Sequence, residues 1–311
     1  MVRASAPGKF ILFGEHAVVY GKPAVAIAVD KRIEVSVERS EKSSIDGKRN
    51  GGRSYINTAV KKVWSGGPLS IRTRSNLPPA SGLGSSAALS VATVAALLHM
   101  RGEFSREATA LNAFLTEYEV QGSASPTDTS ASTLGGAVMV GPAGENPMWH
   151  IEKGGKEWTV SSLEIPDDLD FVIGVTGVRS STGAMVRKVA RFVDGNRAGM
   201  QILSEIEMLT RAGIRALASG DRERLGELMN ENQSHLFSLG VSHPKLEKLI
   251  DAARKHSYGA KLTGAGGGGS MVALTDEPEK VMREVELVGG RPIHVRIDRK
   301  GVQIEENGGI G

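Results

Sequence analysis

The chain has no cysteine among its 311 residues, which excludes disulfide bonds, thiolate metal sites and a cysteine nucleophile. The lack of disulfides agrees with a reducing compartment. The sequence also has no run of basic residues of the kind that nucleic-acid-binding proteins carry, because its 38 Lys and Arg residues are scattered and its formal net charge is +3. This mild positive balance suits an anionic small molecule at least as well as a nucleic acid.

Long hydrophobic runs are absent too. The longest, Ala87–Met100, is too short to cross a bilayer and contains serine, threonine and histidine. Near the N-terminus the apolar run is short and ends at Glu15 and His16, so we expect no signal peptide. These observations predict a soluble, cytoplasmic protein that binds neither membranes nor nucleic acid.

Two enzyme classes receive little support from the sequence. The seven histidines show neither an i,i+4 pair nor zinc-ligand spacing. A G-x-S-x-G nucleophile elbow of the serine hydrolases does not occur either.

Glycine is abundant, with 39 residues against 12 prolines. The glycines gather beside apolar segments, which indicates tight turns next to ordered elements more than flexible linkers. Hydrophobic periodicity predicts an α+β protein. The length favours two lobes, and a change of composition places their boundary near residue 165, giving domains 1–165 and 166–311. Helices are expected at 54–64, 85–100, 106–120, 200–218, 222–237, 244–255 and 277–288. Strands are expected at 33–37, 69–73, 171–176, 259–262 and 270–274, with an edge strand at 292–297, a hairpin joining 137–140 to 148–152, and a frayed tail at 305–311.

The segment LPPASGLGSSAA, from Leu77, has the pattern of a phosphate-binding turn. Gly82 and Gly84 allow the backbone to approach a ligand closely, and Ser85 and Ser86 would cap the helix that follows. A helix N-terminus presents unpaired N–H groups and partial positive charge, which favour an anion. The segment matches neither the P-loop nor the dinucleotide fingerprint. An ordinary capped helix after a flexible turn is the alternative.

Three further segments carry groups that are suited to chemistry. KLTGAGGGGS, from Lys261, is either a loop that approaches a ligand or a flexible hairpin connection. APGKFILFGEHAVVYG, from Ala6, places Lys9, Glu15 and His16 beside apolar strands, where they would be costly unless they are paired or used. A structural role is the alternative for His16. Glu117 and Glu119 supply acids, and Asp128 follows in GSASPTDTSAST, where it is either an acid of the site or a turn residue.

Taken together, these segments resemble the GHMP kinases, a family named for galactokinase and the homoserine, mevalonate and phosphomevalonate kinases. Its three motifs occur in order as PGKFILFGEHAVVYGKPA, LPPASGLGSSAA and KLTGAGGGG, spread over nearly the whole chain. Within the family, the first motif is most similar to that of the members that phosphorylate mevalonate, since Ala17-Val18 stands where galactokinase-like members have Thr-Asp. The segment before Asp128 reads QGSASPTD, where His-Gly-x-Pro-Ser-Gly-x-Asp is frequent in that group.

The resemblance implies a fold, a reaction and a set of site residues. The N-terminal lobe would be like domain 2 of ribosomal protein S5, the C-terminal lobe would be ferredoxin-like with extra helices, and ATP would lie between them. ATP and Mg²⁺ would serve as cosubstrate and metal, with mevalonate as the alcohol. Asp128 would accept the hydroxyl proton or orient the hydroxyl. Lys9 beside it would stabilise charge on the attacking oxygen or help to bind the substrate carboxylate. The family pattern, counted back eleven residues from Asp128, selects Glu117 over Glu119 as the metal ligand.

The implied contacts are ATP at Pro79, Ala80, Ser81, Gly82, Leu83, Gly84, Ser85, Ser86, Ala87, Gly264, Gly266 and Gly267, Mg²⁺ at Ser86 and Glu117, and the alcohol at Glu15, His16 and Thr182. The alternatives are another GHMP kinase, acting on phosphomevalonate, pantoate or the 3-hydroxyl of mevalonate, and a non-catalytic nucleotide-binding regulator. The expected assembly is a monomer or homodimer.

Overall fold

The structure is a computed structural model that describes residues 1–47, 54–78, 81–122, 124–142, 146–166 and 168–305. The strands are β1 (Val2–Phe13), β2 (Ala24–Arg39), β3 (Ser44–Ile45), β4 (Leu69–Ser75), β5 (Ala137–Gly141), β6 (Pro147–Lys153), β7 (Lys156–Leu163), β8 (Asp170–Val175), β9 (Gly259–Thr263), β10 (Ser270–Leu274), β11 (Arg291–Arg296) and β12 (Gln303–Glu305). The helices are the 3-10 turn η1 (Ala17–Tyr20), α1 (Ser54–Val63), α2 (Ser85–Arg101), α3 (Arg106–Gln121), α4 (Thr127–Leu134), α5 (Thr182–Val193), α6 (Arg197–Ser219), α7 (Arg222–Ser238), α8 (Pro244–Arg254) and α9 (Pro278–Leu287).

Two sheets organise the chain. The first runs in the order β12-β1-β2-β5-β7-β6, and β4 pairs with the far half of β2. The second is antiparallel, in the order β11-β8-β10-β9. Numbered along the chain, its strands lie in the order 4-1-3-2, and helices separate the first from the second and the third from the fourth. This is the β-α-β-β-α-β arrangement of ferredoxin-like folds, with extra helices before β9, as expected.

Helix α2 lies at the centre of the first lobe. Its residues 87–98 are all buried, because it packs against β1 and β2 on one side and against α1 and α3 on the other. A helix that is apolar all round is stable only in such surroundings. The small alanine side chains of this segment let the helix approach the sheet closely. The prediction of this helix from its alanine-rich sequence is confirmed.

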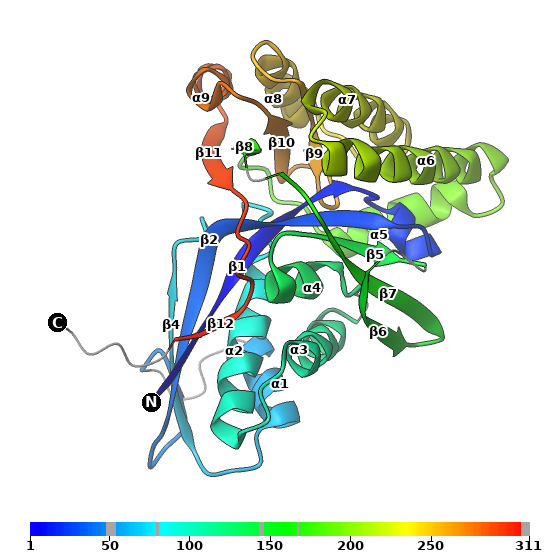
Figure 1. Cartoon of the computed structure of the whole chain (residues 1–311). Helices are drawn as coiled ribbons and strands as arrows, with labels where there is room; N and C mark the ends of the chain where they lie inside the picture. The colour runs from blue at the N-terminus through cyan, green and yellow to red at the C-terminus, as the bar shows by residue number, and fades with distance from the viewer. Residues whose placement is uncertain (48–53, 79–80, 123, 143–145, 167, 306–311) are drawn as a thin grey trace.

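The two lobes share one hydrophobic core. The rings of Phe10 in β1 and Phe171 in β8 lie 5.0 Å apart, in a cluster that also contains Val272 of β10 and Leu225 of α7. The predicted boundary at residue 165 falls between β7 and β8, and β12 returns to pair with β1. Figure 1 shows α1–α4 on one side of the first sheet and the second sheet with α5–α9 on the other.

Several predicted elements need correction. The expected hairpin of 137–140 with 148–152 is wrong, because β7 lies between β5 and β6 and pairs with both. The segment around Asp128 is the helix α4 and not a turn. Helix α5 was not expected at all. The expected tail, apart from Glu305 in β12, lies outside the described residues.

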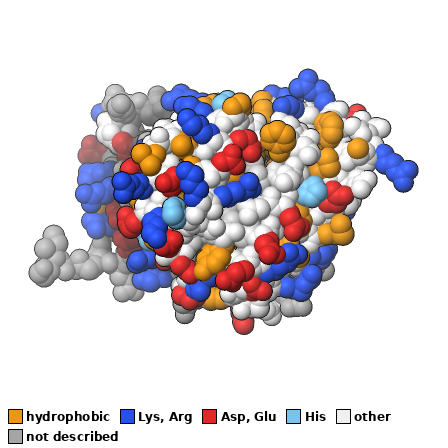
Figure 2. All heavy atoms as spheres, turned by 90° about the horizontal axis from the view of Figure 1, so that it is seen from above, with side chains coloured by type: hydrophobic (Ala, Val, Ile, Leu, Met, Phe, Trp, Pro, Cys, Tyr) orange, Lys and Arg blue, Asp and Glu red, His pale blue; other side chains and the backbone are white. Residues whose placement is uncertain are grey.

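The surface carries charges of both signs. On the face shown in Figure 2, basic and acidic side chains of the described residues are interspersed with hydrophobic ones. Within the described part of the chain, every helix is too short or too polar to pass through a lipid bilayer.

Candidate active site

The predicted phosphate-binding turn lies directly on β1. The amide of Lys9 donates a hydrogen bond to the carbonyl of Leu83 at 3.0 Å, next to a bulge in β1 at Pro7/Gly8. Gly84 has a φ of 66°, and a Cβ there would lie 2.7 Å from Cε of Lys9. Glycine is therefore required at this position both by the left-handed backbone and by the lysine beneath it. Pro79 and Ala80 lie outside the described residues.

The start of α2 differs from expectation. The helix begins at Ser85, but its N-cap is Gly84, and among the described residues no side chain caps its first amides. The prediction that Ser85 and Ser86 cap the helix is therefore wrong. The Ser86 hydroxyl instead hydrogen-bonds the carboxylate of Glu117. The first amides of α2, which carry the positive end of the helix dipole, are thus left without a side-chain acceptor.

The predicted lysine–aspartate couple is present. Nζ of Lys9 lies 2.8 Å from Oδ2 of Asp128. Lys9 is buried in β1, whereas Asp128 is partly exposed in the first turn of α4. Lys9 and Asp128, from segments far apart in the sequence, therefore meet beside the predicted phosphate-binding turn. The prediction that Lys9 sits next to Asp128 is confirmed, and the chemical roles of the two groups stay predictions.

Glu117 adds a second carboxylate beside Asp128 and the hydroxyl of Ser86. Its side chain is buried in α3, and burial, reinforced by the negative charge of Asp128, raises the pKa of Glu117 to about 7. Hydrogen bonds come from Ser86 and from Gln121, whose Nε2 lies 3.2 Å away. Glu119 points elsewhere and pairs with Lys62 of α1 at 2.6 Å. The position of Glu117 beside Ser86 and Asp128 thus favours it over Glu119 as the predicted metal ligand.

This cluster fits a magnesium ion. Mg²⁺ prefers oxygen ligands and typically uses one or two carboxylates together with substrate phosphates and water. Glu117 and Ser86 provide a carboxylate and a hydroxyl in contact. The pKa of Glu117 is raised first by burial and then by repulsion from Asp128, and a bound cation would oppose both effects. Across the described ranges, no group of three His, Cys, Asp or Glu side chains could by itself hold a metal. Phosphate oxygens would therefore have to complete the site.

The second glycine loop is an ordered connection between β9 and β10. A Cβ on Gly266 would meet the carbonyl of Val241 at 2.0 Å, and the amide of Gly267 donates to that same oxygen at 2.6 Å. The close approach inferred from the sequence is thus to the protein's own backbone. At the end of the loop, the Ser270 hydroxyl donates to the carbonyl of Ser81 at 2.8 Å. The two glycine loops, one from each lobe, are held together.

The three predicted alcohol contacts lie in different settings. Glu15 is buried and forms an ion pair with Lys261 of β9. His16 is buried, with Nε2 3.0 Å from the carbonyl of Ala265, and burial lowers its pKa although this hydrogen bond opposes the change. Thr182 is exposed as the first residue of α5. Their contact with an alcohol stays a prediction.

Sequence reasoning missed several residues of the site. Lys261, Asn232 and Ser270 contact predicted residues from the C-terminal lobe. Tyr55 of α1 hydrogen-bonds Ser86 and Gln121 beside Glu117. Lys261 had a usable signal, since a lysine inside an apolar strand is costly unless it is paired. The others had none, because they come from elements whose packing is not visible locally.

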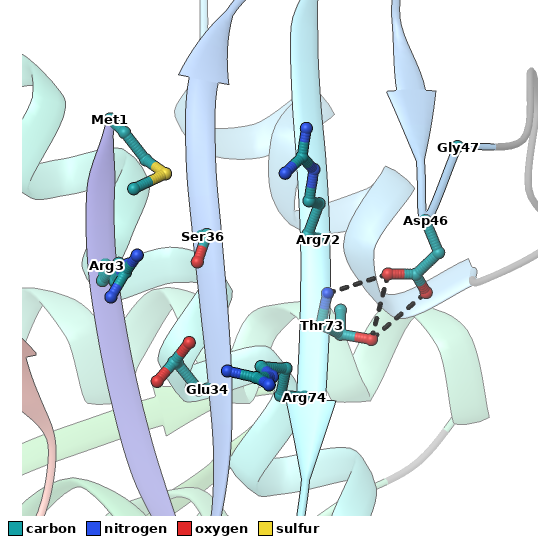
Figure 3. Close-up of a pocket in the computed structure, with 9 residues that line it drawn as sticks. All are labelled: Met1, Arg3, Glu34, Ser36, Asp46, Gly47, Arg72, Thr73 and Arg74. Carbon is teal, nitrogen blue, oxygen red and sulfur yellow. Dashed lines mark hydrogen bonds between the residues drawn. The ribbon is translucent and has the colours of Figure 1, made fainter.

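A separate cavity of about 410 Å³ lies on the outer face of the first sheet, and none of the predicted site residues lines it. In Figure 3, Arg74 of β4 extends toward Glu34, its register partner in β2, and Asp46 accepts a hydrogen bond from the amide of Thr73 at 2.8 Å. Opposite charges on neighbouring strands are ordinary on a solvated sheet face. The cavity is therefore distinct from the cluster around Lys9.

Comparison with known proteins identifies the class. The model of the GHMP kinases N terminal domain matches residues 54–136, and that of the GHMP kinases C terminal matches residues 214–289. The first match contains the phosphate-binding turn, Glu117 and Asp128, and the second contains the loop from Gly264. The chain belongs to the GHMP kinase family.

Within this family, the chain is similar to several mevalonate kinases. A mevalonate kinase from Methanothermobacter thermautotrophicus is 38% identical over 284 residues, which cover 87% of this chain and 89% of the relative. The structure of the Methanococcus jannaschii mevalonate kinase is 27% identical, with a TM-score of 0.77, and covers 95% of this chain and 98% of its own. That of L. major mevalonate kinase in complex with R-mevalonate is 26% identical, with a TM-score of 0.79 and coverages of 96% and 95%.

Proposed function

We propose that this chain transfers the γ-phosphate of ATP to the primary alcohol of mevalonate, giving 5-phosphomevalonate and ADP. The observation that carries the proposal is the contact of Lys9 and Asp128 beside the phosphate-binding turn. The identity to mevalonate kinases over most of the chain supports mevalonate as the alcohol.

Each residue of the site would have its own role in phosphoryl transfer. The reaction depends mainly on positioning the reactants and on neutralising the charge of the phosphates. The amides at the start of α2, which no side chain of the described residues caps, would bind phosphate oxygens. Glu117 and Ser86 would hold Mg²⁺, which neutralises the negative charge of the triphosphate when bound. Asp128 would orient the attacking hydroxyl or take its proton, while the bond from that oxygen to phosphorus forms and the bond to the ADP oxygen breaks. Lys9 would stabilise negative charge on the attacking oxygen.

The test is a panel of alcohols with ATP and Mg²⁺, scored by release of ADP. Mevalonate should give the highest kcat/KM, and NMR of the product should show the phosphate on the C5 oxygen. A phosphate on the 3-hydroxyl, or preference for phosphomevalonate or pantoate, would replace mevalonate 5-phosphorylation by one of those reactions. Tight binding of ATP with no ADP release from any alcohol would favour a non-catalytic regulator.

A further inference from the structure

A lysine and a glutamate are buried together where the two lobes meet. Lys261 of β9 is fully buried, and its Nζ donates to the carboxylate of Glu15 and, at 2.7 Å, to the carbonyl of Leu262. The other carboxylate oxygen of Glu15 accepts from Nδ2 of Asn232 at 3.3 Å. Glu15 follows β1 in the first lobe and Lys261 lies in β9 of the second, so this pair joins residues that are 246 positions apart in sequence.

Stability by itself does not explain this pair. Removing both charges from water is costly, and burial lowers the pKa of Lys261 despite the opposing charge of Glu15. Apolar groups of similar volume are often as stabilising as a buried ion pair, or more so. Among the described residues Oδ1 of Asn232 is also buried without a partner, which adds a further cost. A costly arrangement that holds a defined geometry suggests a role in positioning.

His16, the residue after Glu15, has a backbone conformation that its surroundings must hold in place. His16 has a φ of 62° and a ψ of −40°, a strained conformation that persists only where the surroundings enforce it. Its Nε2 lies 3.0 Å from the carbonyl of Ala265 in the second glycine loop. Glu15 is thus fixed by β9 and His16 by the loop that leaves β9.

A further link fixes the strand that carries Lys9. The Thr263 hydroxyl, at the end of β9, bonds both the amide and the carbonyl of Ile11, each at 2.9 Å. The end of β1 and the turn after it are therefore attached at three points, Ile11 and Glu15 to β9 and His16 to the loop that follows β9. Of these attachments, the one through Lys261 alone joins two charged side chains.

We propose that Lys261 is a positioning residue for phosphoryl transfer, which acts through Glu15 to hold His16 where the alcohol substrate requires it. This inference rests on the proposed function, in which Glu15 and His16 line the alcohol site. Lys261 itself would not touch the reacting atoms. Its loss should therefore weaken use of the alcohol far more than binding of ATP.

A double-mutant cycle tests the proposal with Lys261→Met, Glu15→Gln and the double variant. Each single variant leaves one buried charged or polar group without its partner and should lower the melting temperature by about 5–10 °C, and the double variant should recover most of this loss. In the wild-type background, Lys261→Met should lower kcat/KM for the alcohol about 100-fold, with a normal KM for ATP. In the Glu15→Gln background, the same change should cost nothing further.

Two outcomes of the cycle contradict the proposal. If folded Lys261→Met keeps wild-type kinetics, the pair is merely structural. If the change costs the same in both backgrounds, Lys261 does not act through Glu15. Should the single lysine variant not fold, equal kcat/KM for Glu15→Gln and the double variant supports the proposal, and unequal values overturn it.

A second readout does not depend on activity. Amide hydrogen exchange in the loop 264–269 should accelerate in substrate-free Lys261→Met, and unchanged exchange in the folded variant would overturn the proposal. The matched control is Lys22→Met with Glu207→Gln, which removes a partly exposed ion pair of 2.7 Å between the segment before β2 and α6. It should leave loop exchange and kinetics unchanged. If the wild type uses an alcohol other than mevalonate, the proposed function fails, and the cycle is measured with that alcohol.

Discussion

Lys9, Glu117 and Asp128 come from three different elements, yet each charge affects the others. Nζ of Lys9 lies 2.8 Å from the carboxylate of Asp128. Burial of Glu117, reinforced by the negative charge of Asp128, raises the pKa of Glu117. The sequence could select these residues by the resemblance of their motifs. The contact of Lys9 with Asp128 was likewise expected only from that resemblance, because the spacing of residues along a chain does not determine a distance between separate elements.

Asp128→Asn keeps the shape of the side chain but removes the carboxylate. We expect turnover to fall by about 10²–10⁴-fold, because the hydroxyl loses its proton acceptor or orienting group. Affinity for ATP, measured by calorimetry, should be retained. Asp251→Asn in α8, where the carboxylate is exposed, is the control and should behave as wild type. Near-normal turnover of Asp128→Asn would remove this residue from the mechanism.

Glu117 should make stability depend on pH when Mg²⁺ is absent. Between its ordinary value of 4.5 and the raised pKa of about 7, the folded state holds a proton that the unfolded state has released. Stability is therefore lost as pH rises through this window, by at most about 3 kcal/mol. Glu117→Gln should flatten that slope in thermal melts with a chelator present, and should raise the Mg²⁺ concentration that activity requires. An unchanged slope and Mg²⁺ requirement would contradict the assignment.

Most elements follow from local patterns. Helices α3, α7 and α8 begin at the predicted residue, since apolar spacing and capping residues mark their limits. Helix α4 was not predicted from the sequence, because its serine and threonine residues also favour turns. The wrong hairpin arose because the sequence neighbours β5 and β6 both pair with β7, and strand partners are chosen by packing across the whole sheet.

The first glycine turn provides a test at the scale of an element. Gly84→Ala places a Cβ in a backbone with φ of 66° and 2.7 Å from the Lys9 side chain. It should cost about 1–2 kcal/mol of stability through backbone strain, and should also lower kcat by displacing Lys9. Gly102→Ala, at the other end of α2, has a φ of 77° and nothing within 4 Å. This control should lose similar stability in urea unfolding but keep its kcat. Equal kcat in the two variants would contradict the steric argument.

At the scale of the whole molecule, the shared core should make the two lobes unfold together. All three tryptophans (Trp64, Trp149 and Trp158) lie in the first lobe, while the long helices α6 and α7 belong to the second. Tryptophan fluorescence and far-UV circular dichroism should therefore give coincident urea transitions. Separate transitions would show that the lobes are independent.

The contact between Phe10 and Phe171 lies within this shared core. Phe171→Ala should lower the free energy of unfolding by about 3–5 kcal/mol, because it leaves a cavity between the lobes. Phe237→Ala, on an exposed side chain of α7, is the control and should change it little. A small loss for Phe171→Ala would mean that this contact contributes little to joining the lobes.

The sequence by itself determined the type of most elements, the order of the three glycine-rich motifs and the family that they indicate, because turns, caps and periodicity act over a few residues. Only the tertiary structure decided that Lys261 is buried against Glu15, that Ser270 joins the two glycine loops and that β7 separates β5 from β6. These contacts join residues far apart in the chain, and they form because burying the shared core brings their elements together.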